Sequence, residues 1–282
     1  MVMQHLMTDT FSLDVAGQRL RVARRLGRND TPPLLLINGL GASLEVLEPF
    51  AQALGDIETI RIDLPGTGGS PAPTIPYRPS GLATLLSDAL DMLGCHVIDV
   101  LGISLGGAIA QQLVRQHPER IRRVVLVSTG TGAIMVPGAP SALLSMLTPR
   151  RFTDPDYMAS IAPDLYGGRL RASPELAAGF HRVLKPGGML GYYWQILGLV
   201  GWTSIHWLSQ IRQPTLVLSG ADDPIVPPVN ARIMSRLIPN ARLHIFDDGH
   251  LGLLTSADEL APIVADFLAM DGTAADGAPE PL

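Results

Sequence analysis

A single cysteine, Cys95, occurs among the 282 residues, so the chain cannot form an intramolecular disulfide. Cys95 precedes an apolar, strand-like run and has no CxxC partner, which favours a buried, unreactive thiol. No run of about 18 uninterrupted apolar residues, the length that a membrane-spanning helix needs, is present either. The first ten residues lack the basic and apolar regions of a signal peptide. These absences predict a soluble, cytoplasmic protein without a transmembrane segment.

An excess of positive charge is missing too. Acidic side chains outnumber basic ones by 26 to 21, and the formal net charge is −5. A nucleic-acid-binding protein needs a basic face, so nucleic acid is not an expected partner. Arg21, Arg24, Arg25 and Arg28 do cluster, and we interpret them as an exposed strand edge and loop. The sequence has no HExxH motif and no histidine pair at helical spacing, so neither a metal nor a cofactor is expected.

Short apolar strands alternate with amphipathic helices along most of the chain. A hairpin is predicted around Ala16 and Gly17, between residues 11–15 and 19–23. Buried strands are predicted at 34–37, 59–63, 97–102, 124–128, 215–219 and 242–246. Helices are predicted at about 46–55, 80–94, 105–117, 228–237 and 256–269. This alternation predicts an α/β fold with a mostly parallel, eight-stranded sheet and helices on both faces.

Residues 131–210 interrupt the alternation. This segment is rich in proline, glycine and aromatic residues, and it holds all three tryptophans. A long insertion between two strands of an α/β enzyme is often a lid or cap. We therefore predict four parts: a core from 1–130, an inserted helical lid from 131–210, the rest of the core from 211–270, and a disordered tail from 271–282.

Ser104 lies in the motif GISLG (102–106), which follows a predicted strand and opens a predicted helix. A nucleophile elbow requires this context, because a strained strand-to-helix turn lifts the serine hydroxyl above the edge of the sheet. Glycines are needed where neighbouring backbone crowds such a turn. The five-residue motif alone is weak, and its position between a strand and a helix is what makes Ser104 a candidate nucleophile.

A nucleophilic serine needs a base that is oriented by an acid, and in folds with this elbow the acid precedes the base in the chain. Asp223 follows the strand predicted at 215–219, and His250 follows the strand predicted at 242–246. We predict Asp223 as the acid and His250 as the base. Asp222 is the alternative acid, although an aspartate pair before a proline is also typical of a plain turn.

The oxyanion of an acyl-transfer reaction needs two backbone N–H donors. Leu105, directly after the nucleophile, is the first predicted donor. Leu40, in the glycine-rich loop NGLG after the strand predicted at 34–37, is the second. A phosphate cradle is the rival interpretation of this loop, but the loop lacks the Lys-Ser/Thr of a P-loop.

The chain resembles the intracellular medium-chain-length polyhydroxyalkanoate depolymerases, a branch of the α/β-hydrolases, from about residue 30 to residue 270. The elbow and triad motifs occur throughout that superfamily, whereas the motifs of the insertion are more specific. The matching stretches are 38–45 (NGLGASLE), 63–70 (DLPGTGGS), 102–112 (GISLGGAIAQQ), 135–138 (MVPG), 149–151, 166–168, 191–195 (GYYWQ), 201–208 (GWTSIHWL), 213–218 (QPTLVL), 238–241 (IPNA) and 247–251 (DDGHL).

The resemblance implies an α/β-hydrolase fold and a serine hydrolase that cleaves stored polyester into 3-hydroxyacids. The related polymer synthases carry cysteine where this chain has Ser104, which favours hydrolysis. The family pattern has tryptophan directly after the nucleophile, whereas this chain has Leu105, and we expect that difference to alter the acyl pocket.

The aromatic insertion suits an apolar substrate that also meets water, such as a polyester at the surface of a storage granule. The rival interpretation is that the aromatic residues form the core of the lid itself. The candidate substrate contacts are Met135, Trp194, Trp202, His206, Val226 and Leu251.

Polyester hydrolysis through an acyl-enzyme is therefore the predicted function. The alternatives are a general carboxylesterase or thioesterase acting on small acyl esters, and an acyltransferase that uses the same triad. From another class of protein, a granule-binding protein without activity is the remaining alternative, which the complete triad disfavours.

Overall fold

The computed structural model describes residues 7–28, 31–173, 176 and 188–270, so the tail predicted at 271–282 lies outside the described residues. One eight-stranded sheet has the order β1-β2-β4-β3-β5-β6-β7-β8. The pairs β1–β2 and β2–β4 are antiparallel, and the other neighbours are parallel, which confirms the predicted sheet. The strands are β1 (Thr8–Val15), β2 (Gln18–Arg25), β3 (Leu34–Ile37), β4 (Thr59–Ile62), β5 (Ile98–Ile103), β6 (Ile121–Val127), β7 (Thr215–Gly220) and β8 (Ala241–Phe246).

The arginine cluster of β2 does not lie on an exposed edge, so that prediction was wrong for most of it. β2 pairs with β1 on one side and with β4 on the other. Arg25 is buried, and Arg24 is paired with Glu58. Arg21 reaches toward Glu45 and Asp63. The prediction failed because pairing of β2 with β4 is a long-range contact that a run of arginines does not reveal.

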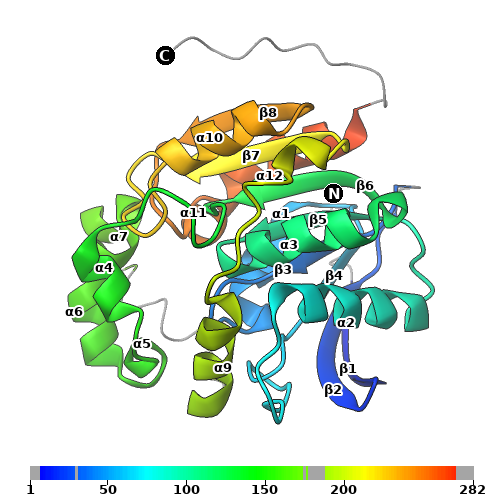
Figure 1. Ribbon diagram of the computed structural model, residues 1–282, viewed down its shortest axis with the longest axis horizontal. Coiled ribbons are helices and arrows are strands. Elements are labelled where there is room, and N and C mark those ends of the chain that lie inside the picture. Colours follow the sequence, from blue (N-terminus) through cyan, green and yellow to red (C-terminus); the bar gives the residue numbers. More distant parts are fainter. Residues whose placement is uncertain (1–6, 29–30, 174–175, 177–187, 271–282) are drawn as a thin grey trace, which may run out of the picture.

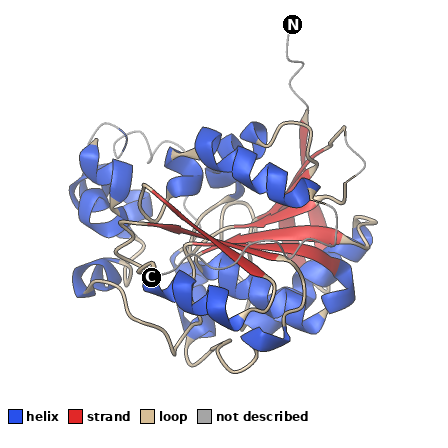
Figure 2. Ribbon diagram, turned by 90° about the horizontal axis from the view of Figure 1, so that it is seen from above, coloured by secondary structure: helices blue, strands red, loops and turns tan. Residues whose placement is uncertain are grey.

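Successive side chains of each central strand pack into two separate layers of core. In β6, Val124 and Leu126 face one cluster, and Val125 and Val127 face the other. The first cluster is covered by helices α2 (Pro79–Met92), α3 (Leu105–Gln116) and α10 (Val229–Leu237). The second is covered by α1 (Glu48–Ala53), α11 (Gly252–Thr255) and α12 (Ala257–Ala269). Figure 2 shows the strands between two layers of helices.

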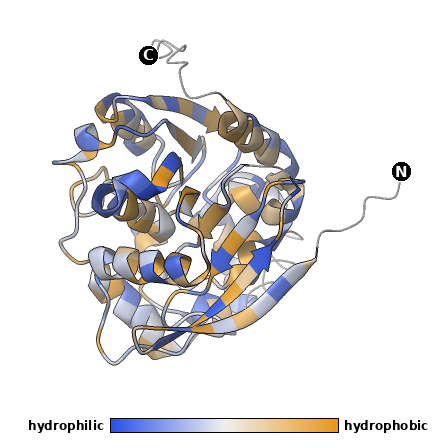
Figure 3. Ribbon diagram, turned by 90° about the vertical axis from the view of Figure 1, so that its right-hand side faces the viewer, coloured by the Kyte–Doolittle hydropathy of each residue, from blue (hydrophilic) through white to orange (hydrophobic). Residues whose placement is uncertain are grey.

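Hydropathy follows this layering. The period-two alternation of a strand places apolar side chains on the buried face. Figure 3 shows hydrophobic and hydrophilic residues alternating along the strand that leads in from the N-terminus.

Cys95, just before β5, is buried, and burial raises the pKa of its thiol, as expected for an unreactive cysteine. No helix within the described ranges combines the length and apolarity needed to cross a bilayer.

In the chain, a helical segment follows β6 and precedes β7. In space, it occupies one end of the sheet (Figure 1). It has its own apolar cluster, which includes Phe152, Leu165, Tyr166 and Tyr192. We call the described residues from 131 to 210 the lid. Its helices are α4 (Pro140–Ser145), α5 (Arg150–Thr153), α6 (Pro155–Tyr166), α7 (Gly168–Ala172) and α9 (Met189–Leu199).

Candidate active site

Ser104 lies at a strained turn between β5 and α3. Its backbone has φ 55° and ψ −118°, in the positive-φ region that side chains other than glycine rarely adopt. A Cβ on Gly106 would lie 2.0 Å from the carbonyl oxygen of Ile37, and one on Gly102 would lie 2.2 Å from the carbonyl oxygen of Gly106. Only glycine fits at either position. The turn therefore has the geometry of a nucleophile elbow.

Asp223 and His250 form the pair that the chain order predicted. His250 Nδ1 lies 2.8 Å from Asp223 Oδ2, and both side chains are buried. The other oxygen, Asp223 Oδ1, accepts hydrogen bonds from the backbone N–H groups of Ile225 and Val226, each at 2.9 Å. Because a carboxylate only accepts, Nδ1 carries the proton in this contact. That tautomer leaves Nε2 with a free lone pair.

Asp222, the alternative acid, points elsewhere. Its side chain is about half exposed, pairs with Arg171 and accepts the backbone N–H of Gly168 at 2.9 Å. Both partners belong to α7. Asp222 therefore joins the lid to the loop after β7, while among the described residues the histidine ring is held by Asp223.

The loop that carries His250 is also joined to the lid by hydrogen bonds. The His250 backbone N–H donates to the Tyr166 carbonyl at 2.8 Å, and the two rings stack at a centroid distance of 6.5 Å. Asp248 Oδ1 accepts the N–H of Arg169 at 2.9 Å, while Oδ2 accepts the hydroxyls of Thr255 and Ser256. Neither Tyr166 nor Asp248 was predicted as a site residue, although both lie in motifs that match the resembled family.

The glycine-rich loop after β3 approaches the nucleophile closely. A Cβ on Gly39 would lie 3.3 Å from the Cβ of Ser104. The Asn38 side chain donates to the Ser43 carbonyl at 2.8 Å, which holds the loop closed on itself. Leu40 therefore lies in the loop next to Ser104, and Leu105 begins helix α3 directly after it.

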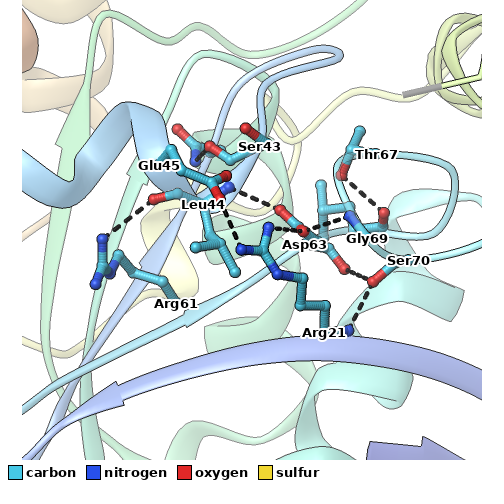
Figure 4. A network of polar contacts seen from close by, with 11 residues as sticks. Arg21, Ser43, Leu44, Glu45, Arg61, Asp63, Thr67, Gly69 and Ser70 are labelled. Carbon is cyan, nitrogen blue, oxygen red and sulfur yellow. Dashed lines mark hydrogen bonds and ion pairs between the residues drawn. The ribbon is translucent and has the colours of Figure 1, made fainter. Parts of the chain in front are cut away.

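A polar network behind this loop fixes its far end (Figure 4). Asp63 Oδ1 accepts the N–H of Leu44 at 2.7 Å, and Oδ2 accepts the N–H of Gly69 at 2.8 Å. Arg21 reaches both Asp63 at 3.2 Å and Glu45 at 2.6 Å. Burial raises the pKa of the Asp63 carboxyl, against the opposing effect of these N–H and guanidinium donors. The network thus anchors the loop to the strands β2 and β4.

Four predicted site residues line one pocket: Leu40, Ser104, His250 and Leu251. Its volume is about 50 Å³, enough for several water molecules. Apolar side chains make up most of the remaining wall. The other lining residues are Asn38, Gly39, Ala42, Val46, Ile103, Met146, Arg151, Phe152, Tyr166 and Ile225.

Five predicted substrate contacts lie outside the lining of that pocket. Trp202 packs edge-on against Trp207 in the core beside α3, and its indole N–H donates to Gln112. His206 is exposed, and the indole of Trp194 donates to the Pro73 carbonyl. Val226 belongs to the apolar cluster of the lid, and Met135 is partly buried and packs against that cluster. Trp202 therefore lies in the core beside the sheet, whereas the aromatic residues that form the core of the lid itself are Phe152, Tyr166 and Tyr192.

The Leu105 side chain does not line the pocket either. It is buried in the core cluster that α2 and α3 cover. Whether leucine in place of the expected tryptophan alters the acyl pocket therefore stays a prediction. Across the described part of the chain, no group of three or more histidine, cysteine or acidic side chains is arranged to hold a metal ion.

Comparison with known proteins agrees with this geometry. Residues 32–257 match the family model described as the alpha/beta hydrolase fold. The chain is 48% identical over 271 residues to a poly(3-hydroxyalkanoate) depolymerase from Ectopseudomonas oleovorans, covering 96% of each protein. It is 30% identical to the pimeloyl-[acyl-carrier protein] methyl ester esterase of Aromatoleum aromaticum, covering 84% of this chain and 98% of that one.

Among solved structures, the enol-lactonase from Burkholderia xenovorans LB400 superposes with a TM-score of 0.80 at 25% identity. The match covers 92% of this chain and 100% of that one. The predicted resemblance is thus confirmed by a relative similar over nearly the whole chain. The chain belongs to the α/β-hydrolase family and, within it, to the family of the poly(3-hydroxyalkanoate) depolymerase.

Proposed function

We propose that the chain is a serine hydrolase that cleaves the ester bonds of polyhydroxyalkanoate polyester, or of its oligomers, and releases 3-hydroxyacids. The observation that carries the proposal is the 2.8 Å contact of Asp223 with His250, which lines the same pocket as Ser104. The 48% identity to a poly(3-hydroxyalkanoate) depolymerase supports this choice of substrate.

The acylation step uses Ser104 as nucleophile and His250 as base. The Ser104 hydroxyl attacks the ester carbonyl carbon while His250 Nε2 takes its proton. Asp223 keeps the proton on Nδ1 and stabilises the imidazolium that forms. The N–H groups of Leu40 and Leu105 stabilise the negative charge on the carbonyl oxygen. The imidazolium then protonates the leaving alcohol oxygen, and the acyl group stays on Ser104.

The deacylation step repeats this chemistry with water. His250 Nε2 takes a proton from water, and the oxygen attacks the acyl carbon of the ester on Ser104. Collapse of the tetrahedral intermediate returns the proton to the Ser104 oxygen and releases the 3-hydroxyacid. Each step is balanced without a cofactor, because one water molecule is consumed for each ester bond.

An exposed apolar stripe on α9 supports a polymeric, water-insoluble substrate. Met189, Tyr193 and Leu197 recur at helical spacing and are 65, 40 and 49% exposed, and Val200, directly after the helix, is 62% exposed. Exposed apolar patches mark surfaces that meet another apolar phase. In this proposal the enzyme works in the cytoplasm at the surface of storage granules, with the stripe of α9 against the polymer.

Replacement of Ser104 by alanine tests the nucleophile. We expect Ser104→Ala to lower the hydrolysis of polymer emulsions and of soluble p-nitrophenyl esters by about 10⁶-fold, as for other serine hydrolases. Mass spectrometry of products from the unaltered enzyme should detect free 3-hydroxyacids. Near-normal ester hydrolysis by the folded Ser104→Ala protein would rule the mechanism out.

The alternative that an observation favours is an esterase for small acyl esters, because the pimeloyl methyl ester esterase is matched over 98% of its length. Rates on polymer emulsion and on short esters separate the two. Hydrolysis of short esters with an intact polymer would replace the depolymerase proposal by this one.

A further inference from the structure

The loop that carries the Leu40 N–H contains a β-turn formed by residues 39–42, with Leu40 as its second residue. The Ala42 N–H donates to the Gly39 carbonyl at 3.2 Å, and Gly41, the third residue of the turn, has φ 72°. A positive φ at this position is typical of a type II turn. The central peptide of this turn joins Leu40 to Gly41, and the Leu40 N–H belongs to the peptide directly before it.

Side chains from the lid contact both ends of that peptide. The Gly41 N–H donates to Gln195 Oε1 at 3.0 Å, and the Leu40 carbonyl accepts Arg151 Nη2 at 3.4 Å. A Cβ on Gly41 would lie 2.7 Å from the ring of Phe152 and 2.8 Å from the ring of Tyr192. Helices α5 and α9 therefore enclose the turn on its amide, carbonyl and α-carbon.

The contacting side chains are themselves fixed in place. Arg151 is 2% exposed, donates to the Tyr192 hydroxyl at 2.5 Å and packs over the rings of Phe152 and Tyr192. The Tyr192 hydroxyl in turn donates to the Met146 carbonyl at 2.5 Å. Rigid neighbours of this kind hold a functional group in one geometry.

Gln195 has one further feature that indicates its role. The side chain is 5% exposed, and its amide nitrogen is buried without a hydrogen-bond partner among the described residues. A buried donor that is left unpaired is unfavourable and calls for an explanation. The explanation is that the oxygen of the same amide accepts the Gly41 N–H, and this hydrogen bond fixes the orientation of the whole amide.

We propose that Gln195 and Arg151 are positioning residues of the oxyanion hole. Resting on the proposed function, this inference adds that the docked lid fixes the turn and with it the position of the Leu40 N–H relative to Ser104. An oxyanion hole works because its donors are oriented before the reaction begins. The hole is complete only while α5 and α9 are seated on the loop.

Replacement of Gln195 by leucine tests the inference with a soluble p-nitrophenyl ester. We expect Gln195→Leu to lower kcat by about tenfold to a hundredfold and to leave KM within about twofold, because only the transition state uses the hole. Affinity for a boronic acid, which forms a tetrahedral adduct on the serine, should fall with kcat. Gln195→Glu keeps an acceptor for the Gly41 N–H and should restore most of both.

Asn230 offers a matched control at another attachment of the lid. It is 2% exposed, and its side-chain amide accepts the Val136 N–H at 2.9 Å and donates to the Val136 carbonyl at 2.8 Å. Asn230→Leu also removes a buried amide from the lid contacts, so its thermal stability should fall while kcat stays within about threefold.

Two results would overturn the inference. One is unchanged kcat and boronate affinity in Gln195→Leu, and the other is an equal loss of both in Asn230→Leu. If Gln195→Leu does not fold, Arg151→Lys decides, because lysine lacks the planar fork that reaches Leu40 and Tyr192 together. We then expect a several-fold fall in kcat and boronate affinity, and no fall in either rejects the inference. Failure of the proposed function is distinguished by full activity of Ser104→Ala.

Discussion

At the scale of single residues, the site depends on which polar atoms of each side chain already have a hydrogen-bond partner. Both oxygens of Asp223 are engaged, one by the His250 ring and the other by two backbone N–H groups. The carboxylate therefore has a fixed orientation and imposes one tautomer on the imidazole. Asp222, one position earlier, is half exposed and pairs with Arg171. Adjacent residues of the same type thus have separate tasks.

Replacement of Asp223 by asparagine tests this division. The amide nitrogen facing Nδ1 would favour the tautomer with its proton on Nε2, where the base needs a lone pair. We expect kcat to fall by about 10⁴-fold without loss of the fold, as in the serine-protease triad. Asp222→Asn is the matched control and should keep kcat within about threefold. Similar losses in both variants would contradict the assignment of Asp223 as the acid.

At the scale of elements, the lid helix α7 is joined to the catalytic loops by two carboxylates. Asp222, in the loop after β7, and Asp248, in the loop after β8, each accept a backbone N–H from the first turn of α7. Burial raises the pKa of Asp248, but its bonds from the hydroxyls of Ser256 and Thr255 and from two backbone N–H groups outweigh burial, so the pKa is lowered overall. The ionised form of Asp248 is therefore the one that the folded protein favours.

The lowered pKa of Asp248 predicts a pH-dependent contribution to stability. A carboxyl whose pKa is lower when folded stabilises the protein above its unfolded pKa of about 3.9, and this contribution is lost as the pH falls through the folded value. Asp248→Asn should lower the free energy of unfolding by about 2 kcal/mol at neutral pH. Urea titrations should show that the deficit shrinks below about pH 4. A deficit independent of pH, or an equal one in the exposed neighbour variant Asp247→Asn, would contradict this account.

At the scale of the whole molecule, the sequence predicted whatever depends on local pattern and chain order. The sheet, the elbow at Ser104 and the order of Asp223 and His250 follow from strand and turn signals, and the structure brings Asp223 and His250 into contact. Trp202 was misjudged because its place in the core depends on packing against α3. Gln195 was missed since its partner Gly41 is 154 positions away. Contacts of that kind carry no periodic signal in the sequence.

The apolar stripe on α9 gives the molecule one face suited to an insoluble polymer. Its members Met189, Tyr193 and Leu197 are spaced by four residues, so they share one side of the helix. Burial of each such side chain against an apolar surface is favourable by about 1.5–3 kcal/mol. A charge placed in the stripe should therefore weaken adsorption to the polymer and leave the pocket around Ser104 unchanged.

Leu197→Glu is the variant that tests this role of the stripe. We expect its rate on a polymer emulsion to fall by about tenfold, because the lost apolar contact and the added charge both oppose adsorption. Its kcat and KM on a soluble p-nitrophenyl ester should stay within about twofold. Met92→Glu, an exposed apolar position on α2, is the control and should change neither rate. A parallel fall on both substrates would show that Leu197 supports the site, and an unchanged polymer rate would leave the stripe without a role in adsorption.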